Sequence, residues 1–441
     1  MLALLQRLVD VRREEIPLLG WTWLYYYAVL AAYYVLRPIR DEAGVASGVD
    51  NLPWLFTATL AAMIVANPLF GALVSRLTRV QFVSWTYRFF ALNLIVFFVL
   101  LKVATPEQNV WMGRAFFNWT AVFNLFVPSV FWAFMTDLFT PEQAKRLFGP
   151  ISAAGTLGAM SGAALTAVLV QWVPGMYLLF LSVALLELAV LAVRRLSRLS
   201  SALTESGTRQ GGEQVIGGSA LAGVRQALSS PYLLGISGYM LLYTILSTFL
   251  YVQQAAIVDQ TFASRAARTA FFAQVDVVTN LIALVLQMFA VSNIIRVLGV
   301  ALTLGLLPTL TAFGFTTLGL MPTAAVVVAF QALRRAGNFA VARPTREVLF
   351  TVLSREDRYK AKSFIDTFVY RTGDQIGVWV QPAIAMLGLG LAATAWVAVP
   401  LSLLWLANGV WLGYRQESLA APVPDPVVPG AGSLDPATPA A

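Results

Sequence analysis

Apolar stretches close to twenty residues long recur along almost the whole chain, separated by short charged or Pro/Gly-marked breaks. A helix of ~20 apolar residues spans a hydrocarbon core of about 30 Å, whereas a β-barrel would show short alternating strands. The pattern therefore predicts an all-α polytopic membrane protein of about twelve transmembrane helices. The expected spans are 17–36, 53–75, 82–103, 111–139, 147–171, 174–194, 231–256, 268–290, 295–317, 322–343, 361–388 and 389–413.

A polar stretch rich in Gly and Ser divides these runs into two sets of six. Short echoes favour an internal repeat, because Ser75 and Ser292 both precede an Arg-Val pair and Leu138 and Leu349 both begin a Leu-Phe-Thr loop. Two similar bundles around a central site are typical of transporters. The expected parts are an amphipathic cytoplasmic segment at 1–16, six-helix bundles at 17–194 and 231–413, a flexible cytoplasmic linker at 195–230 and a disordered cytoplasmic tail at 414–441.

The Lys and Arg clusters fall mainly on one side of this twelve-span layout, which by the positive-inside rule places both termini and the linker in the cytoplasm. The first segment ends in charges without a small-residue cleavage site, so we expect insertion through the first span. The expected location is a bacterial inner membrane, crossed many times.

The amino-acid composition narrows the range of possible functions further. Of 441 residues, 58% are hydrophobic and 12% charged, and the chain has neither histidine nor cysteine. These absences exclude His and Cys nucleophiles and His or Cys metal sites, so we expect no enzyme, metal or cofactor. The net charge of +8 lies in short clusters between apolar runs rather than on one face, which argues against nucleic acid and for membrane topology.

Charges inside the spans are the informative residues, because each costs roughly 3 kcal/mol or more at bilayer depth. The eleventh span carries Asp366, Tyr370 and Asp374 at four-residue intervals, and its Arg371 is placed to pair with Asp374 or Gln375. Two interpretations stay open for this helix, an internal ion pair that holds the bundles together and direct contact with a solute.

The eighth and tenth spans also carry polar groups. Asp276 and Asn280 lie about one turn apart in the eighth, where the aspartate is either a cation or proton site or a partner for a neighbouring helix. In the tenth span, Arg334 and Arg335 favour an anionic solute, since a guanidinium clamps carboxylate or phosphate in bidentate fashion. Adjacent residues point in different directions on a helix, so we expect at most one of the two to face a cavity.

Other polar features have simpler interpretations. Arg37 and Arg40, with neighbouring acids, close the first span, and we expect several such arginines to snorkel to the membrane interface. Glu187 has no evident partner in sequence. The glycine run from Gly155 lacks the Lys-Ser/Thr of a phosphate loop and is typical of close helix packing in lipid.

Several stretches, in order, resemble the nucleotide (ATP/ADP) translocase family of the major facilitator superfamily. They are YYVLRPIRD before Glu42, SVFWAFMTDLFTPEQAKRLFGPI from Ser129 and ARPTREVLFTVLSREDRYKAKSFID from Ala342. The resemblance implies a major facilitator-like fold and a transport function. It also places Arg346, Glu347, Lys362 and Asp366 on family positions, and Asp276 where the family has an aspartate early in span eight.

This chain departs from the family where the exchangers carry charge. It has Thr120 and Thr248 in place of acidic residues, and Asp374 in place of a lysine that would suit a polyphosphate. An acid at that position repels a polyphosphate, so the departures argue against ATP/ADP exchange itself.

The sequence thus predicts a carrier that moves a small anionic or nucleotide-like solute across the bilayer by alternating access, with a proton or a counter-substrate as candidate coupling species. The alternatives are a proton-coupled drug or metabolite transporter and a non-transporting membrane scaffold or sensor. A membrane enzyme is disfavoured because the carboxylates are scattered over different spans. The expected substrate-binding residues are Arg40, Asp276, Asn280, Arg334, Arg371 and Asp374. The expected gating or cytoplasmic ion-pair residues are Arg79, Glu142, Lys145, Arg146, Glu347, Lys362 and Asp366.

Overall fold

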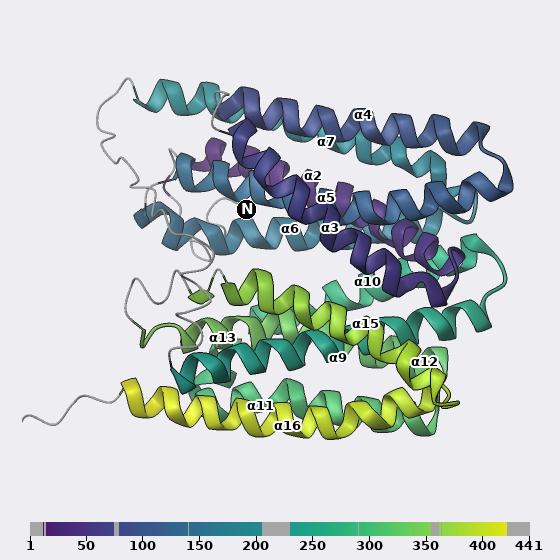
Figure 1. The fold of residues 1–441 in the computed structure, drawn as a ribbon. Helices are drawn as coiled ribbons and strands as arrows, with labels where there is room; N and C mark the ends of the chain where they lie inside the picture. The colour runs from purple at the N-terminus through teal and green to yellow at the C-terminus, as the bar shows by residue number, and fades with distance from the viewer. Residues whose placement is uncertain are drawn as a thin grey trace, which may run out of the picture.

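The computed structural model describes residues 12, 15–74, 79–139, 141–204, 230–289, 291–353, 361, 362 and 364–420, and within them it contains helices and no strands. Helices α2–α7 form an N-terminal bundle and the elements from α9 to α16 a C-terminal bundle, which lie one above the other in Figure 1. The N-terminal helices are α2 (Ile16–Ala46), α3 (Leu52–Val74), α4 (Arg79–Val103), α5 (Pro106–Leu138), α6 (Pro141–Leu169) and α7 (Leu178–Thr204).

The C-terminal bundle contains two passes that are not regular α-helices. Its elements are α9 (Pro231–Thr261), α10 (Arg265–Phe289), α11 (Val291–Leu320), α12 (Ala324–Gly337), the π-helix η4 (Asn338–Ala342), α13 (Arg343–Leu349), the π-helix η5 (Ile365–Val369), α15 (Tyr370–Met386) and α16 (Leu391–Ala420). With α12–η4–α13 and η5–α15 each counted as one pass, the described residues cross the bundle twelve times, as the apolar pattern predicted.

Local sequence signals set several of the helix starts. Thr105 caps α5 in a capping box with Gln108, and the hydroxyl of Ser230 accepts hydrogen bonds from the first turn of α9. Six passes run past their expected ends, and the longest extensions are those of α2 to Ala46, α7 to Thr204 and α16 to Ala420. The extension of α2 matters most, since it places Arg37 and Arg40 inside the helix instead of at its end.

The two bundles are built alike around glycine contacts. In the N-terminal bundle α6 lies so close to α2 that a Cβ on Gly162 would come within 2.4 Å of the Ala31 carbonyl oxygen. In the C-terminal bundle α15 approaches α9 in the same way, and a Cβ on Gly373 would meet the Thr244 hydroxyl at 1.8 Å. These are the first and fifth passes of each half, so the packing supports an internal repeat and confirms the packing role of the glycine run in α6.

The bundles meet through pairs of passes that the repeat also relates. Helix α6 of the N-terminal bundle packs against α10, and α3 packs against α15. Counted along the chain, α6 is pass five and α10 is pass eight, while α3 is pass two and α15 is pass eleven. Swapping the first six passes with the last six turns one pair into the other. We call the end where α2 leads to α3 and α9 leads to α10 the distal end, on the right in Figure 1, and the opposite end, where α2 and α9 begin, the linker end.

Substitution of Gly162 by alanine tests the close approach of α6 to α2. The added methyl group has no room beside the Ala31 carbonyl, so we expect a loss of about 1–3 kcal/mol in unfolding free energy, seen as a lower melting temperature in detergent. Gly149→Ala in the same helix is the matched control, because no atom lies within 4 Å of its Cβ position. An equal melting temperature for both variants would contradict the packing described.

Candidate functional site

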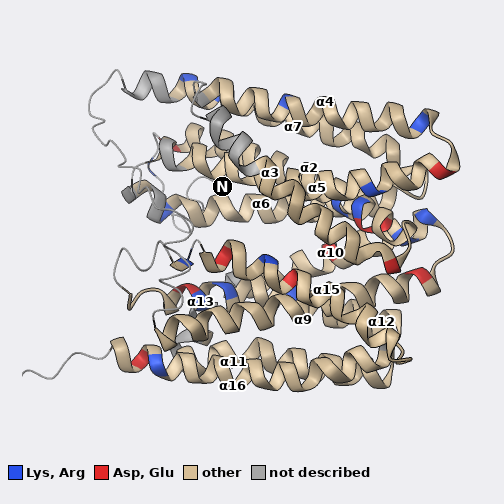
Figure 2. Cartoon of the chain, in the orientation of Figure 1, with Lys and Arg blue, Asp and Glu red and all other residues tan. Residues whose placement is uncertain are grey.

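Charged residues are concentrated where the two bundles meet, in the distal half of the molecule (Figure 2). Nine helices of the described chain are long and apolar enough to cross a membrane, and α2, α12 and α15 are not among them. These three passes supply most of the charges at the boundary between the bundles.

Asp276 of α10 joins the two bundles. Its Oδ1 accepts a hydrogen bond from Arg37 Nη1 of α2 at 2.8 Å and another from Arg335 Nη1 of α12 at 2.6 Å. Its side chain is 2% exposed, so the triad sits away from the outer surface. The other oxygen, Oδ2, is buried without a hydrogen-bond partner in the described chain. We call this triad the Asp276 joint.

A second polar link lies one turn further along α2. Arg40 Nη1 donates to Asp41 Oδ1 at 3.0 Å, and its guanidinium lies over the Phe117 ring at 3.9 Å. Tyr251 of α9 donates its hydroxyl to the same Asp41 oxygen at 3.2 Å, which ties the N-terminal helix to the C-terminal bundle. Cation–π contacts and short bonds of this kind hold Arg40 in one orientation.

The distal end is closed by a third ionic group. The carboxylate of Glu42 in α2 is 4% exposed and accepts hydrogen bonds from Arg265 Nε at 2.9 Å and from Arg268 Nη2 at 3.5 Å. Both arginines lie at the start of α10. Further polar contacts join α3 to α15, where the Thr57 hydroxyl donates to Gln375 at 2.9 Å. All hydrogen bonds and ion pairs recorded between described residues of the two bundles lie from mid-height to this end.

Asp374 of α15 anchors a third cluster at the same depth. Its Oδ2 accepts from Arg371 Nη1 at 3.2 Å, and its Oδ1 accepts from the Thr248 hydroxyl of α9 at 3.2 Å. The predicted pairing of Arg371 with Asp374 is thus confirmed. The Arg371 side chain is 31% exposed, so part of its guanidinium stays open.

Arg334 is buried inside the C-terminal bundle and is 2% exposed. It donates to the Thr311 hydroxyl at 3.3 Å, the Ser247 hydroxyl at 2.8 Å and the Tyr243 carbonyl at 3.1 Å. All of these partners are neutral, and no carboxylate of the described chain pairs with it. Only one of the two arginines reaches the boundary between the bundles, as expected, but it is Arg335 and not Arg334, the residue predicted to contact the solute.

These clusters together carry excess positive charge. Five arginines at positions 37, 40, 334, 335 and 371 stand against three aspartates at positions 41, 276 and 374, an excess of two positive charges. At 1.5 Å per residue, Arg37, Asp276, Arg335 and Asp374 lie roughly 14–18 Å from the distal ends of their helices. That depth is about half of a hydrocarbon core.

Four of the seven predicted gating residues form ion pairs. Arg146 pairs with Glu15 at 2.8 Å, Lys362 pairs with Glu347, and Asp366 lies 3.9 Å from Arg346. Each of these pairs stays within one bundle, towards the linker end. The side chains of Arg79, Glu142 and Lys145 lie outside the described residues.

Asn280, from the predicted substrate-binding set, donates a hydrogen bond to the Asp276 backbone carbonyl and so stabilises its own helix.

The hydrogen bonds that Glu15 accepts, including those of its ion pair with Arg146, lower the pKa of its carboxyl group. Burial alone would raise the pKa of the Glu15 carboxyl, but hydrogen bonds from Arg146, from the Arg12 backbone N–H and from Gln143 outweigh burial and keep the pKa below its ordinary value. The bonds thus favour the ionised form. This pair fixes the start of α2 to the start of α6.

Two interpretations of the sequence need correction. Arg37 does not snorkel to the interface, because Asp276 holds it in the Asp276 joint. Glu187, which has no evident partner in sequence, contacts Arg88 of the neighbouring helix α4 at 3.2 Å and needs no correction. The four-residue spacing from Asp366 to Asp374 does not run through a regular α-helix, because the π-helix η5 changes the register.

Sequence reasoning did not choose Arg37, Arg335 and Glu42 as site residues. Two sequence features pointed to Glu42 as an ion-pair residue: it follows a basic segment, and two arginines begin the eighth span. For Arg335 it was only the adjacent pair, which does not say which member faces the partner bundle. In the described part of the chain, no three carboxylates lie close enough together to ligate a metal ion.

The fold resembles that of solved membrane transporters. A bacterial homologue of the iron transporter ferroportin in an inward-facing state superposes with a TM-score of 0.64 at 13% identity, covering 91% of this chain and 99% of the other. A bacterial homologue of the lysosomal transporter Spinster, inward-facing and unoccupied, gives 0.53 at 14% identity over 93% and 97%. A POT family transporter in complex with 5-aminolevulinic acid gives 0.60 at 10% identity over 91% and 96%.

At these identities the likeness shows the fold, which is major facilitator-like. The sequence matches no protein-family model and no curated protein. The resemblance to the nucleotide translocases is therefore confirmed in its fold, while the narrower family stays a prediction.

Replacement of Asp276 by asparagine tests the Asp276 joint. Without the carboxylate, Arg37 and Arg335 face each other in a buried place, so we expect a loss of about 3–5 kcal/mol in unfolding free energy, measured by thermal unfolding in detergent. Asp259→Asn is the control, since Asp259 is 47% exposed and Arg268 keeps Glu42 as a partner. That change should cost less than about 1 kcal/mol. Equal losses would contradict the role given to Asp276.

Proposed function

We propose that the protein is a membrane transporter that moves a small anionic solute by alternating access, and that it performs no enzymatic step. The observation that carries the proposal is an excess of arginine over aspartate from mid-height towards the distal end. Four arginines face three aspartates where the bundles meet, and Arg334 is buried beside them inside the C-terminal bundle. Uncompensated charge in a membrane interior is expensive, so it persists where a ligand of the opposite sign balances it.

Partly open guanidinium groups supply the direct contacts in this proposal. Arg371 is 31% exposed, and Arg37, Arg335 and Arg40 are 18%, 13% and 16% exposed in their side chains. Arg371 belongs to the C-terminal bundle and Arg40 to the N-terminal bundle, so the partly open guanidinium groups come from both sides of the boundary. Buried Arg334 adds positive potential without contact, because its five N–H donors are engaged by neutral groups or enclosed by the bundle.

The proposal includes a direction of opening. Between described side chains, the polar contacts that join the bundles lie from mid-height to the distal end, which supports a state closed distally. We propose that the linker end, where many side chains lie outside the described residues, is the open one. Two of the similar structures are described as inward-facing, which agrees if the linker end is cytoplasmic. Transport then requires the distal ionic groups to separate.

Proton-coupled transport of a drug or metabolite is the second candidate. The observation behind it is the Asp276 carboxylate, which links the two bundles and whose Oδ2 is buried without a hydrogen-bond partner in the described chain. Uptake that collapses when an ionophore removes the pH gradient would favour this candidate over exchange of anions.

A thermal-shift screen of the purified protein tests the anionic solute. We expect at least one carboxylate or phosphorylated metabolite to raise the melting temperature, whereas its neutral counterpart does not, because a ligand at 100 times its Kd stabilises by about 2.7 kcal/mol. Arg371→Gln should abolish the rise, since it removes an open guanidinium. Lys102→Gln, at the distal end of α4, is the control that should keep it.

Other outcomes of the screen decide between the remaining functions. Stabilisation by cations or neutral compounds alone would overturn the anionic proposal. An effect of the anion that survives Arg371→Gln would overturn the site. No stabilisation by any compound would favour the non-transporting scaffold or sensor.

A further inference from the structure

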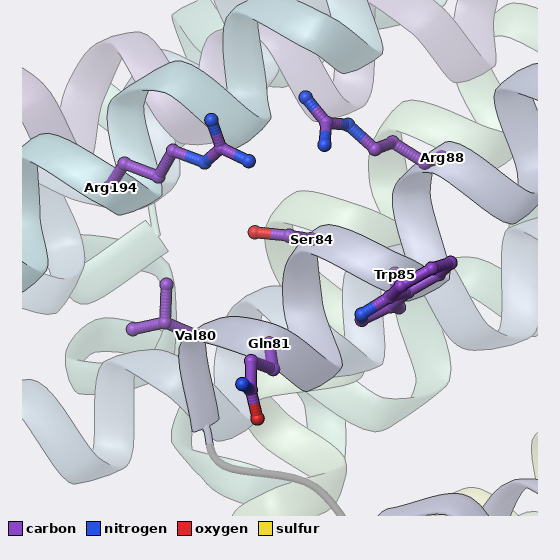
Figure 3. Close-up of a pocket in the computed structure, with 6 residues that line it drawn as sticks. All are labelled: Val80, Gln81, Ser84, Trp85, Arg88 and Arg194. Atoms are coloured by element: carbon purple, nitrogen blue, oxygen red, sulfur yellow. The ribbon is translucent and has the colours of Figure 1, made fainter.

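A small cavity lies on the outer face of the N-terminal bundle, between α4 and α7 and away from the boundary with the other bundle (Figure 3). Its volume is about 220 Å³. The lining residues are Val80, Gln81, Ser84, Trp85, Arg88 and Arg194. Arg88 and Arg194 extend towards the opening from opposite sides, and the Ser84 hydroxyl points into the space between them.

The cavity has a net positive charge. Arg88 donates from Nε and Nη2 to Glu187 at 3.2 and 3.3 Å, so one positive charge is balanced. Arg194 is exposed and pairs with no carboxylate of the described chain. A charged guanidinium at a membrane surface is favourable where an anion is within reach, and it offers two parallel N–H donors to a phosphate.

Ser84 supplies a second, independent observation. Its side-chain oxygen is buried and has no hydrogen-bond partner among the described residues. Most other buried hydroxyls of the described spans, such as those of Thr22, Thr120 and Ser402, donate to the carbonyl one turn earlier. Besides Ser84, the buried hydroxyls without a partner among the described residues are those of Thr86, Thr279 and Thr394. A buried hydroxyl left without such a bond costs free energy, so a ligand oxygen that bonds to it gains stability.

The surface beside the cavity suits acyl chains. Trp85 is 66% exposed, and from it Phe89, Leu92, Val96 and Val99 continue along one face of α4 towards the distal end, each between 48% and 60% exposed. Trp favours the membrane–water boundary, where its ring spans apolar and polar surroundings. Ser84 is about 8 Å from the start of α4 at 1.5 Å per residue, which suits a headgroup at that boundary.

We propose that this cavity binds the phosphodiester headgroup of an anionic phospholipid, with Arg194 and the Ser84 hydroxyl bonding to the phosphate and the acyl chains lying along the exposed face of α4. The net positive charge disfavours a zwitterionic lipid, whose own cation would meet Arg88 and Arg194. The site is separate from the solute site and does not depend on the function proposed above.

Lipid titrations of the full-length protein in detergent test this site. We expect dioleoyl-phosphatidylglycerol to raise the melting temperature at lower concentration than dioleoyl-phosphatidylcholine does. Arg194→Gln should weaken the apparent affinity for phosphatidylglycerol by about tenfold, as the loss of one charge-assisted bond implies. Ser84→Ala should weaken it by a smaller factor and leave the melting temperature without lipid unchanged.

The matched control is Arg195→Gln, the next residue on α7, which is exposed but does not line the cavity. It should keep the affinity of the unmodified protein. The proposal fails if Arg194→Gln binds phosphatidylglycerol as the unmodified protein does, or if Arg195→Gln weakens binding equally, because the attraction would then be diffuse. Stabilisation by inorganic phosphate alone, with none from the lipid, would assign the cavity to a soluble anion and would also overturn the proposal.

Discussion

At mid-height the two bundles are linked by the buried carboxylate of Asp276. Asp276 accepts hydrogen bonds from Arg37 and Arg335 on the same oxygen, at 2.8 and 2.6 Å, and these arginines come from different bundles. Without the carboxylate the two guanidinium groups would repel each other in a place that water reaches poorly. A buried pair of this kind adds modest net stability while intact, but removing one partner is strongly destabilising.

The contacts within a bundle are of a different kind. Glycines at positions 162 and 373 allow two helix backbones to approach so closely that a methyl group would not fit. Such packing relies on dispersion and on complementary shape. The boundary between the bundles relies instead on hydrogen bonds and ion pairs, which water or a charged ligand can replace. Each bundle can therefore move as a rigid body while the boundary changes.

The sequence predicts the fold well, because apolar length and Lys/Arg distribution are dictated by the membrane itself. Arg371 with Asp374 was predictable too, since partners three residues apart on one helix meet by geometry alone. The Asp276 joint was not, because Arg37 lies far from Asp276 in the chain and its pairing depends on how the bundles dock. The π-helices η4 and η5 also escape a pattern that assumes 3.6 residues per turn, and they shift which side chains share a face.

The most direct test measures distances between spin labels at the two ends of the molecule by double electron–electron resonance, for which a chain without cysteine is well suited. One pair of cysteines, at positions Asp50 and Ser264, reports on the distal end, and a second pair, at Gly149 and Thr351, reports on the linker end; all four residues are exposed. If the Asp276 joint holds the distal end closed, the Asp276→Asn protein will show a longer distal distance and a shorter distance at the linker end. Unchanged distributions at both ends would contradict the account.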